Sequence, residues 1–154
     1  MKKFFFIFLL LSLLIITSCT KNSTNSAIKN INDEITVYSS GGCGCCGLYS
    51  NYLKSKGKID VNVINVADIS LIKRQYKIPG FLESCHTTII GDYFIEGHIP
   101  LEAIDKLLTE KPDIAGIAMP GMPSGSPGMP GAKTQKFTIF AVKKDGNQEI
   151  FMEF

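Results

Sequence analysis

Residues 35–57 read ITVYSSGGCGCCGLYSNYLKSKG, and the predicted fold is built outward from them. Its first four residues are β-branched or aromatic and predict a strand over 35–39, which Gly41-Gly42 then break. Apolar residues recur afterwards at helical spacing, and Gly57 is suited to the helix C-cap: Leu48, Tyr49, Tyr52 and Leu53. The stretch therefore predicts a strand, a short loop and a helix, with three cysteines where the loop meets the helix.

The rest of the chain extends this pattern. Strands are predicted at 61–66, 87–90 and 93–96, and helices follow Asp68 and Pro100. The resulting order, β-α-β-α-β-β-α, is that of a thioredoxin-like α/β domain. A Met/Pro/Gly-rich loop and a C-terminal β-hairpin, 137–142 with 149–154, complete the predicted domain over residues 35–154.

The N-terminus predicts export and anchoring. Two lysines precede an apolar run at 4–16, which has the length of a signal-peptide core and is short for a membrane span. Thr17-Ser18-Cys19 resembles the lipobox of bacterial lipoproteins; the alternative is an ordinary secretory signal. We expect a signal peptide at 1–18, lipidation of Cys19 and a lipid-anchored polar tether at 19–34. The expected location is the cell envelope, on its periplasmic or extracytoplasmic face.

The charge balance argues against a nucleic-acid partner. The 154 residues include 16 basic and 14 acidic side chains. Loss of Lys2 and Lys3 with the signal peptide would leave 14 of each, whereas nucleic-acid binders usually have a strongly basic surface. With Cys19 lipidated, four thiols remain for chemistry: Cys43, Cys45, Cys46 and Cys85.

The cysteine cluster allows three interpretations. Cys43 and Cys46 have the C-x-x-C spacing of thiol–disulfide enzymes, and a helix N-terminus favours thiolates. Cys45 adds a competing disulfide partner but also a third soft ligand, which favours a metal site over dithiol exchange. The third interpretation is a disulfide-stapled interaction module, in which the adjacent Cys45 and Cys46 could not easily bridge each other.

Two histidines and three methionines are further candidate ligands. Cys85-His86 lies just before a predicted strand, at the position where thioredoxin-like enzymes place a cis-proline facing the C-x-x-C loop. His98 would serve as a ligand or as a hydrogen-bonding group that orients one. Thioether sulfur, which suits Cu(I), is offered by Met119, Met122 and Met129. The alternative is that these methionines are apolar side chains that pack their loop against the core. The loop itself is expected to cover the site.

Four motifs occur in one order along the chain: CGCC at 43–46, SCHT at 84–87, EGHIP at 96–100 and MPGMPSGSPGM at 119–129. In these motifs the chain resembles the CopG-like family of envelope metal-binding proteins (domain of unknown function number 411), over roughly residues 35–154. The resemblance implies a copper-binding thioredoxin-like domain, with the metal held by the cysteine cluster, Cys85 and nearby histidine. Family members often carry Trp where this chain has Tyr49.

Ligand chemistry points to the same metal. Thiolates prefer Cu(I), Zn(II) and softer ions, and one thiolate can bridge two Cu(I) ions, so a multinuclear Cu(I) site is reasonable. A tetrahedral zinc site is the alternative. We therefore expect a copper-binding protein for copper tolerance or hand-over, with copper redox activity as an extension and a copper-efflux or copper-chaperone protein as partner. The rival is a membrane-tethered thiol–disulfide oxidoreductase using Cys43 and Cys46.

Overall fold

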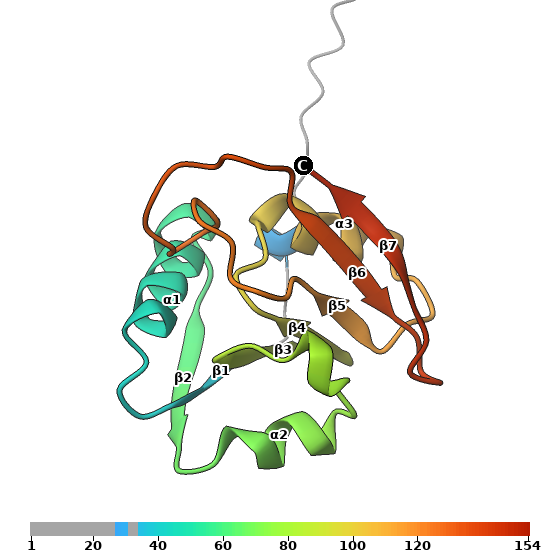
Figure 1. Ribbon diagram of the computed structural model, residues 1–154, viewed down its shortest axis with the longest axis horizontal. Helices are drawn as coiled ribbons and strands as arrows, with labels where there is room; N and C mark the ends of the chain where they lie inside the picture. The colour runs from blue at the N-terminus through green and yellow to red at the C-terminus, as the bar shows by residue number, and fades with distance from the viewer. Residues whose placement is uncertain (1–26, 31–33) are drawn as a thin grey trace, which may run out of the picture.

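The computed structural model describes residues 27–30 and 34–154, which form a mixed α/β domain (Figure 1). Its elements, in chain order, are η1 (Ala27–Asn30), β1 (Ile35–Ser40), α1 (Gly44–Gly57), β2 (Val61–Val66), α2 (Ile69–Gln75), η2 (Gly80–Leu82), β3 (His86–Ile90), β4 (Tyr93–Glu96), α3 (Leu101–Glu110), β5 (Gly116–Ala118), β6 (Thr138–Val142) and β7 (Gln148–Glu153). The predicted order β-α-β-α-β-β-α is therefore confirmed from β1 to α3, as is the C-terminal hairpin.

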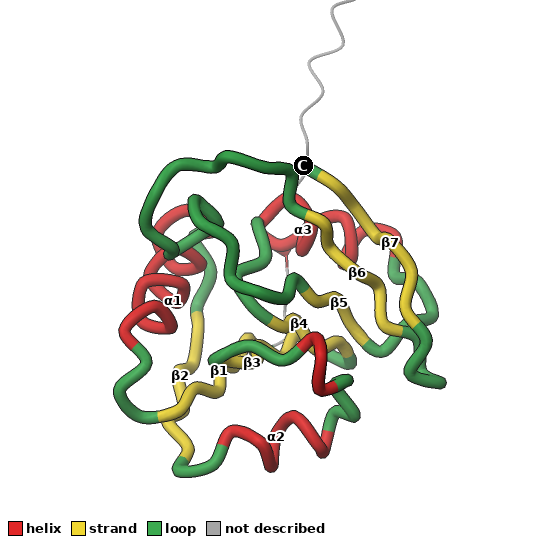
Figure 2. The backbone as a smooth tube through the Cα atoms, in the orientation of Figure 1, coloured by secondary structure: helices red, strands yellow, loops and turns green. Residues whose placement is uncertain are grey.

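The seven strands of the described residues belong to one sheet, in the order β2-β1-β3-β4-β5-β6-β7. The pairs β1–β2 and β4–β5 are parallel and the other pairs are antiparallel. Strand β5 was not predicted, because three residues give too short a pattern to separate a buried strand from a loop. It matters because it joins the β6–β7 hairpin to the rest of the sheet (Figure 2).

Both faces of the sheet are covered. Successive strand residues point to opposite faces, so the neighbours Phe94 and Ile95 of β4 belong to different core clusters. The larger cluster includes Ile95 and residues of α1 and α3, such as Leu53 and Leu107. The smaller one combines Phe94 with the segment that follows α2. In Figure 1, α2 accordingly lies across the sheet from α3.

The helix termini follow from local sequence, with one correction. Asp68 caps α2 as predicted, because its carboxylate accepts a hydrogen bond from the Ser70 N–H (2.9 Å). Gly57, the predicted C-cap of α1, is instead its last residue, and Lys58 adopts the left-handed conformation. A Cβ atom at position 57 would lie 2.5 Å from Ile59 Cδ1, so the Ile59 side chain would have to shift to admit a larger residue.

Part of the predicted tether belongs to the domain. Ile28 is 4% exposed within the larger core cluster, and its N–H donates to Asp105 Oδ1 of α3 (3.1 Å). Within the segment 19–34, which the sequence predicts to be a polar tether, the apolar side chain of Ile28 therefore packs against α3. The signal peptide, Cys19 and the tether residues 20–26 and 31–33 lie outside the described residues. In the described part of the chain, no helix combines the length and apolar character that a membrane crossing requires.

An Ile28→Ala substitution tests this packing. We expect it to lower the free energy of unfolding by about 2–4 kcal/mol, the usual cost of truncating a buried isoleucine. Urea unfolding of the protein measures the change, and Ile150→Ala, at a side chain that is 62% exposed, is the matched control. Equal, small losses in the two variants would contradict the packing of residues 27–30 on α3.

Candidate metal centre

Strand pairing brings the two cysteine-bearing segments together. Strands β1 and β3 are antiparallel, and their register pairs Ser39 with His86. The C-terminal end of β1, which leads into the cysteine loop, therefore lies beside the start of β3, where Cys85-His86 is found. The described residues contain no cis peptide bond, so these two side chains occupy this position without a cis-proline.

The sulfur atoms of the four cysteines form one compact group. All four lie within 4.8 Å of one another. Cys45 Sγ is 3.5 Å from Cys43 Sγ and 3.4 Å from Cys85 Sγ, and Cys46 Sγ is 3.5 Å from Cys85 Sγ. Cys43 and Cys46 form a disulfide, whereas Cys45 and Cys85 are free thiols. Three sulfurs thus come from the start of α1, and the fourth comes from the turn before β3.

The two histidines form a buried layer next to this group. His86 and His98 are both 0% exposed, their ring centroids are 4.9 Å apart, and each has a nitrogen within 4.8 Å of Cys85 Sγ. His98 Nδ1 lies 2.6 Å from the Pro127 carbonyl oxygen. A carbonyl only accepts hydrogen bonds, so Nδ1 carries the proton and Nε2 of the neutral ring keeps its lone pair. Within the described residues, Nε2 of neither histidine has a hydrogen-bond partner.

Burial sets the protonation of these groups. It lowers the pKa of His86 to about 3, with smaller contributions from His98 and Lys73, and it also lowers the pKa of His98. Burial, followed by the neighbouring Cys45, raises the pKa of the Cys85 thiol to about 12. The imidazoles are therefore neutral at pH 7, as metal ligation requires, and a metal binding to Cys85 would displace a proton. Cys85 does not share the thiolate character that the sequence predicted for thiols at the helix N-terminus.

Tyr49 packs against both imidazoles. Its ring centroid is 4.7 Å from that of His86 and 5.3 Å from that of His98, and its hydroxyl donates to the Ile99 carbonyl (2.9 Å). Tyr49 is 0% exposed, and burial raises its pKa. The helical spacing of the sequence marked Tyr49 only as a core residue, whereas the structure shows that it supports both histidine rings.

Only one of the three candidate methionines reaches the thiols. Met122 Sδ lies 3.4 Å from Cys85 Sγ. Met119 is 1% exposed within the larger core cluster, which agrees with its interpretation as an apolar plug. Met129 lines a separate shallow groove along α1, beside Leu48 and Tyr52.

The loop that carries these methionines covers the centre. Figure 1 shows the orange segment between β5 and β6 running out to α1 and back to the sheet. Two contacts fix it: the Pro127 carbonyl accepts the hydrogen bond from His98, and Gly128 packs on the backbone of α1. A Cβ atom at Gly128 would lie 2.7 Å from the Tyr49 backbone nitrogen, so only glycine allows this approach. The expected cover over the site is thus present.

Sequence reasoning missed a buried ion pair beneath Cys85-His86. Lys73 of α2 and Glu96 at the end of β4 pair with side chains that are only 2% and 0% exposed. No motif marks Lys73, because a lysine in a short amphipathic helix is normally solvated. Glu96 lies in the EGHIP motif, but its role there was not predicted.

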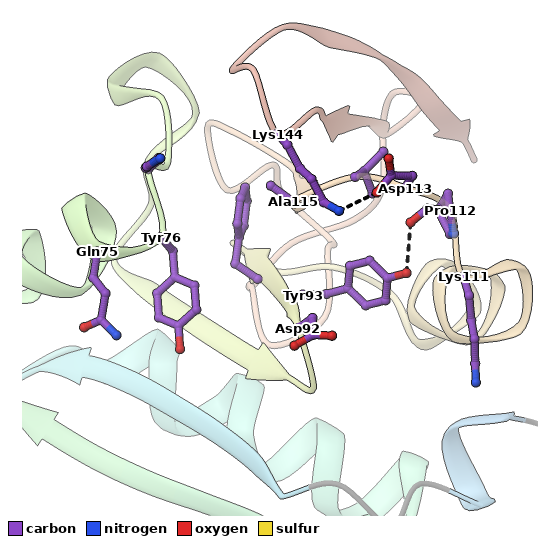
Figure 3. A pocket seen from close by; sticks show the side chains of 12 residues that line it. Gln75, Tyr76, Asp92, Tyr93, Lys111, Pro112, Asp113, Ala115 and Lys144 are labelled. Atoms are coloured by element: carbon purple, nitrogen blue, oxygen red, sulfur yellow. Dashed lines mark hydrogen bonds and ion pairs between the residues drawn. The ribbon is translucent and has the colours of Figure 1, made fainter.

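A cavity of about 430 Å³ lies apart from this centre (Figure 3). Tyr76, Tyr93 and Lys144 line it; the Tyr93 hydroxyl donates to the Pro112 carbonyl (2.9 Å), and Lys144 pairs with Asp113. None of its lining residues is a candidate metal ligand, so it does not extend the thiol and imidazole cluster.

Comparisons with known proteins agree with the sequence resemblance. A protein-family profile described as a protein of unknown function, DUF411, matches residues 82–129. Two solved structures of a copper resistance protein CopG, forms 2 and 1, are each 35% identical to the chain and cover 79% of it. The match spans 98% and 96% of those chains, with TM-scores of 0.73 and 0.72. No curated protein sequence matches. The chain therefore belongs to the CopG-like DUF411 family.

Proposed function

We propose that this protein binds Cu(I) in the cell envelope for copper tolerance or hand-over to a partner. The proposed ligands are Cys43, Cys45, Cys46 and Cys85, with His86 and His98 beside them. One observation carries the proposal: four sulfur atoms from two chain segments lie within 4.8 Å of one another. The similarity to a copper resistance protein supports copper as the metal.

The donor set fits copper better than zinc. Thiolate, imidazole and the thioether of Met122 all suit Cu(I), whereas thioether sulfur is poorly matched to Zn(II). Cys85 belongs both to the four-thiol group and to a second group with His86 and His98. A thiolate shared in this way can bridge two ions, which supports a multinuclear Cu(I) centre. Copper redox activity is compatible with the same ligands, since thiolate and imidazole support both oxidation states.

Anchoring and partners complete the proposal. Cleavage after residue 18 and acylation of Cys19 would place the domain at the membrane surface. Two acyl chains give stable anchoring, where one is marginal. A copper-efflux or copper-chaperone protein would deliver or remove the ion there.

The second candidate function is thiol–disulfide exchange. The Cys43–Cys46 disulfide favours it, as the C-x-x-C spacing predicted. Cys85 Sγ lies 3.5 Å from Cys46 Sγ, and Cys45 Sγ lies 3.5 Å from Cys43 Sγ. Both sulfurs of the disulfide thus have an internal thiol competing with any substrate, which favours metal binding over clean exchange.

Metal analysis with a Cys45→Ser variant separates the two functions. We expect wild-type protein purified from its own envelope to carry at least one copper per chain and to reduce insulin no faster than buffer. Cys45→Ser should lose most of the copper. If the wild-type protein carries no metal and its insulin reduction survives Cys45→Ser, the protein is a thiol–disulfide oxidoreductase and the copper-binding proposal is wrong. If it carries stoichiometric zinc, the metal of the centre is zinc and not copper.

The methionines supply a matched pair of variants. Met122→Leu removes a sulfur next to Cys85, and we expect it to weaken Cu(I) binding by about tenfold, the scale of losing a supporting contact at a metal site. Met129→Leu makes the same chemical change in the groove along α1 and should leave the affinity unchanged. Competition with a colorimetric Cu(I) chelator measures both. Equal affinities in the two variants would remove Met122 from the proposed centre.

A further inference from the structure

We propose that Glu96 and Lys73 form a buried positioning pair that fixes the Ser84–Cys85 turn and, through it, the Cys85 sulfur. This inference rests on the proposed metal-binding function, because positioning matters only if Cys85 takes part in the centre. Among the described residues, neither Lys73 nor Glu96 forms a hydrogen bond with the side chain of a candidate metal ligand, so the pair acts indirectly.

The Glu96 carboxylate holds the chain on both sides of Cys85-His86. Its Oε1 accepts hydrogen bonds from the backbone N–H and the hydroxyl of Ser84, the latter at 2.8 Å. Its Oε2 accepts from the Thr87 hydroxyl at 2.7 Å. Thr87 and Glu96 are also register partners in the β3–β4 pairing. The turn that carries the sulfur and the imidazole is therefore fastened at both ends to one carboxylate.

Lys73 makes this arrangement possible in a buried environment. Its ammonium group pairs with Glu96 and donates to Thr87 Oγ1 (3.2 Å). A buried carboxylate without a countercharge would be strongly destabilising. Buried ion pairs can often be replaced by apolar side chains of similar volume without loss of stability, so core packing alone does not require this pair.

The connection to the centre runs through Ser84. This residue directly precedes Cys85, and its hydroxyl also lies 2.8 Å from the His86 carbonyl oxygen. Cys85 Sγ is the sulfur that meets the α1 cysteines and Met122, at 3.4–3.5 Å. Metal ligands must be held to within about half an ångström of their productive positions. A looser turn would separate Cys85 from the other sulfurs while the rest of the domain stayed folded.

Two changes at the pair, one change at Ser84 and one control test this inference. Glu96→Gln leaves Lys73 unpaired, and the double variant Lys73→Met/Glu96→Leu replaces the pair with apolar side chains. Ser84→Ala removes one link to the turn while leaving the ion pair intact. Glu110→Gln is the matched control, because it removes the carboxylate of the exposed Lys106–Glu110 pair. The measurements are Cu(I) affinity, the thiolate-to-copper charge-transfer spectrum, the thermal midpoint, and amide exchange at Ser84 in the metal-free protein.

We expect Glu96→Gln and the double variant each to lose Cu(I) affinity by about tenfold or more, with a shifted charge-transfer spectrum. The double variant should recover the wild-type thermal midpoint but not the affinity, and its Ser84 amide should exchange about tenfold faster or more. Ser84→Ala should lose affinity by several-fold at an unchanged midpoint, which keeps the test decisive if the double variant does not fold. Glu110→Gln should change nothing.

Two results would overturn the positioning role. One is wild-type Cu(I) affinity and wild-type charge-transfer spectrum in either the double variant or Ser84→Ala, since the pair would then only stabilise the fold. The other is an unchanged Ser84 exchange rate in the metal-free double variant or, if that variant does not fold, in Glu96→Gln. Failure of the metal-binding function is distinguishable, because wild-type protein would then bind no Cu(I) while the metal-free exchange rates still report on the turn.

Discussion

A Cys85→Ser variant is expected to lose Cu(I) affinity by at least about 100-fold, the largest effect of any single substitution at the centre, because removing a ligand exceeds the loss caused by its supporting contacts. Cys85 is the one sulfur shared by the four-thiol group and the group with His86 and His98. A serine hydroxyl is a hard, weakly acidic ligand and cannot replace a bridging thiolate.

Chelator competition on the reduced protein measures this loss, and circular dichroism of the metal-free variant confirms that it folds. Cys45→Ser is the comparison, because Cys45 belongs only to the four-thiol group and should cost less. A smaller loss in Cys85→Ser than in Cys45→Ser would show that the turn before β3 is peripheral to the metal centre.

Oxidation is expected to have the second largest effect. The Cys43–Cys46 disulfide removes two of the four thiolates, so the oxidised protein should bind fewer Cu(I) ions than the reduced protein and bind them about 100-fold more weakly. Two electrons and two protons convert the disulfide to two thiols. The test is to measure copper stoichiometry before and after reduction of the protein with a phosphine. The phosphine is removed by buffer exchange before copper is added.

A Cys46→Ser variant supplies the control for the redox effect. It cannot form the Cys43–Cys46 disulfide, so its copper stoichiometry should not respond to this oxidation. If oxidised and reduced wild-type protein bind copper equally, the metal lies outside the disulfide pair, and Cys45, Cys85 and the histidines would hold it alone.

Local sequence patterns were sufficient to predict that the four cysteines lie close together. The strand–loop–helix stretch at 35–57 placed Cys43, Cys45 and Cys46 at a helix start, where α1 indeed begins. The strand order also placed Cys85-His86 opposite them, because β1 and β3 must lie side by side in that topology. These features depend on residue spacing along short segments, which a single sequence displays.

The features that were missed depend on packing between distant segments. The sequence near Ile28 does not show that this side chain packs against α3. Met122 and Met129 also look alike in the sequence, and only the folded position of their loop, over α1 and Cys85, distinguishes them. The same holds for Lys73, whose partner lies 23 residues away on another element. The supporting shell of the centre is therefore a property of the tertiary structure.

The most direct test of the central claim is a titration of the fully reduced domain with Cu(I), in which bound copper and reactive thiols are counted together. If the sulfur cluster is the metal centre, Cys43, Cys45, Cys46 and Cys85 should all become protected from alkylation in step with copper binding. Thiols that stay fully reactive while copper binds, or a domain that binds no Cu(I), would contradict it.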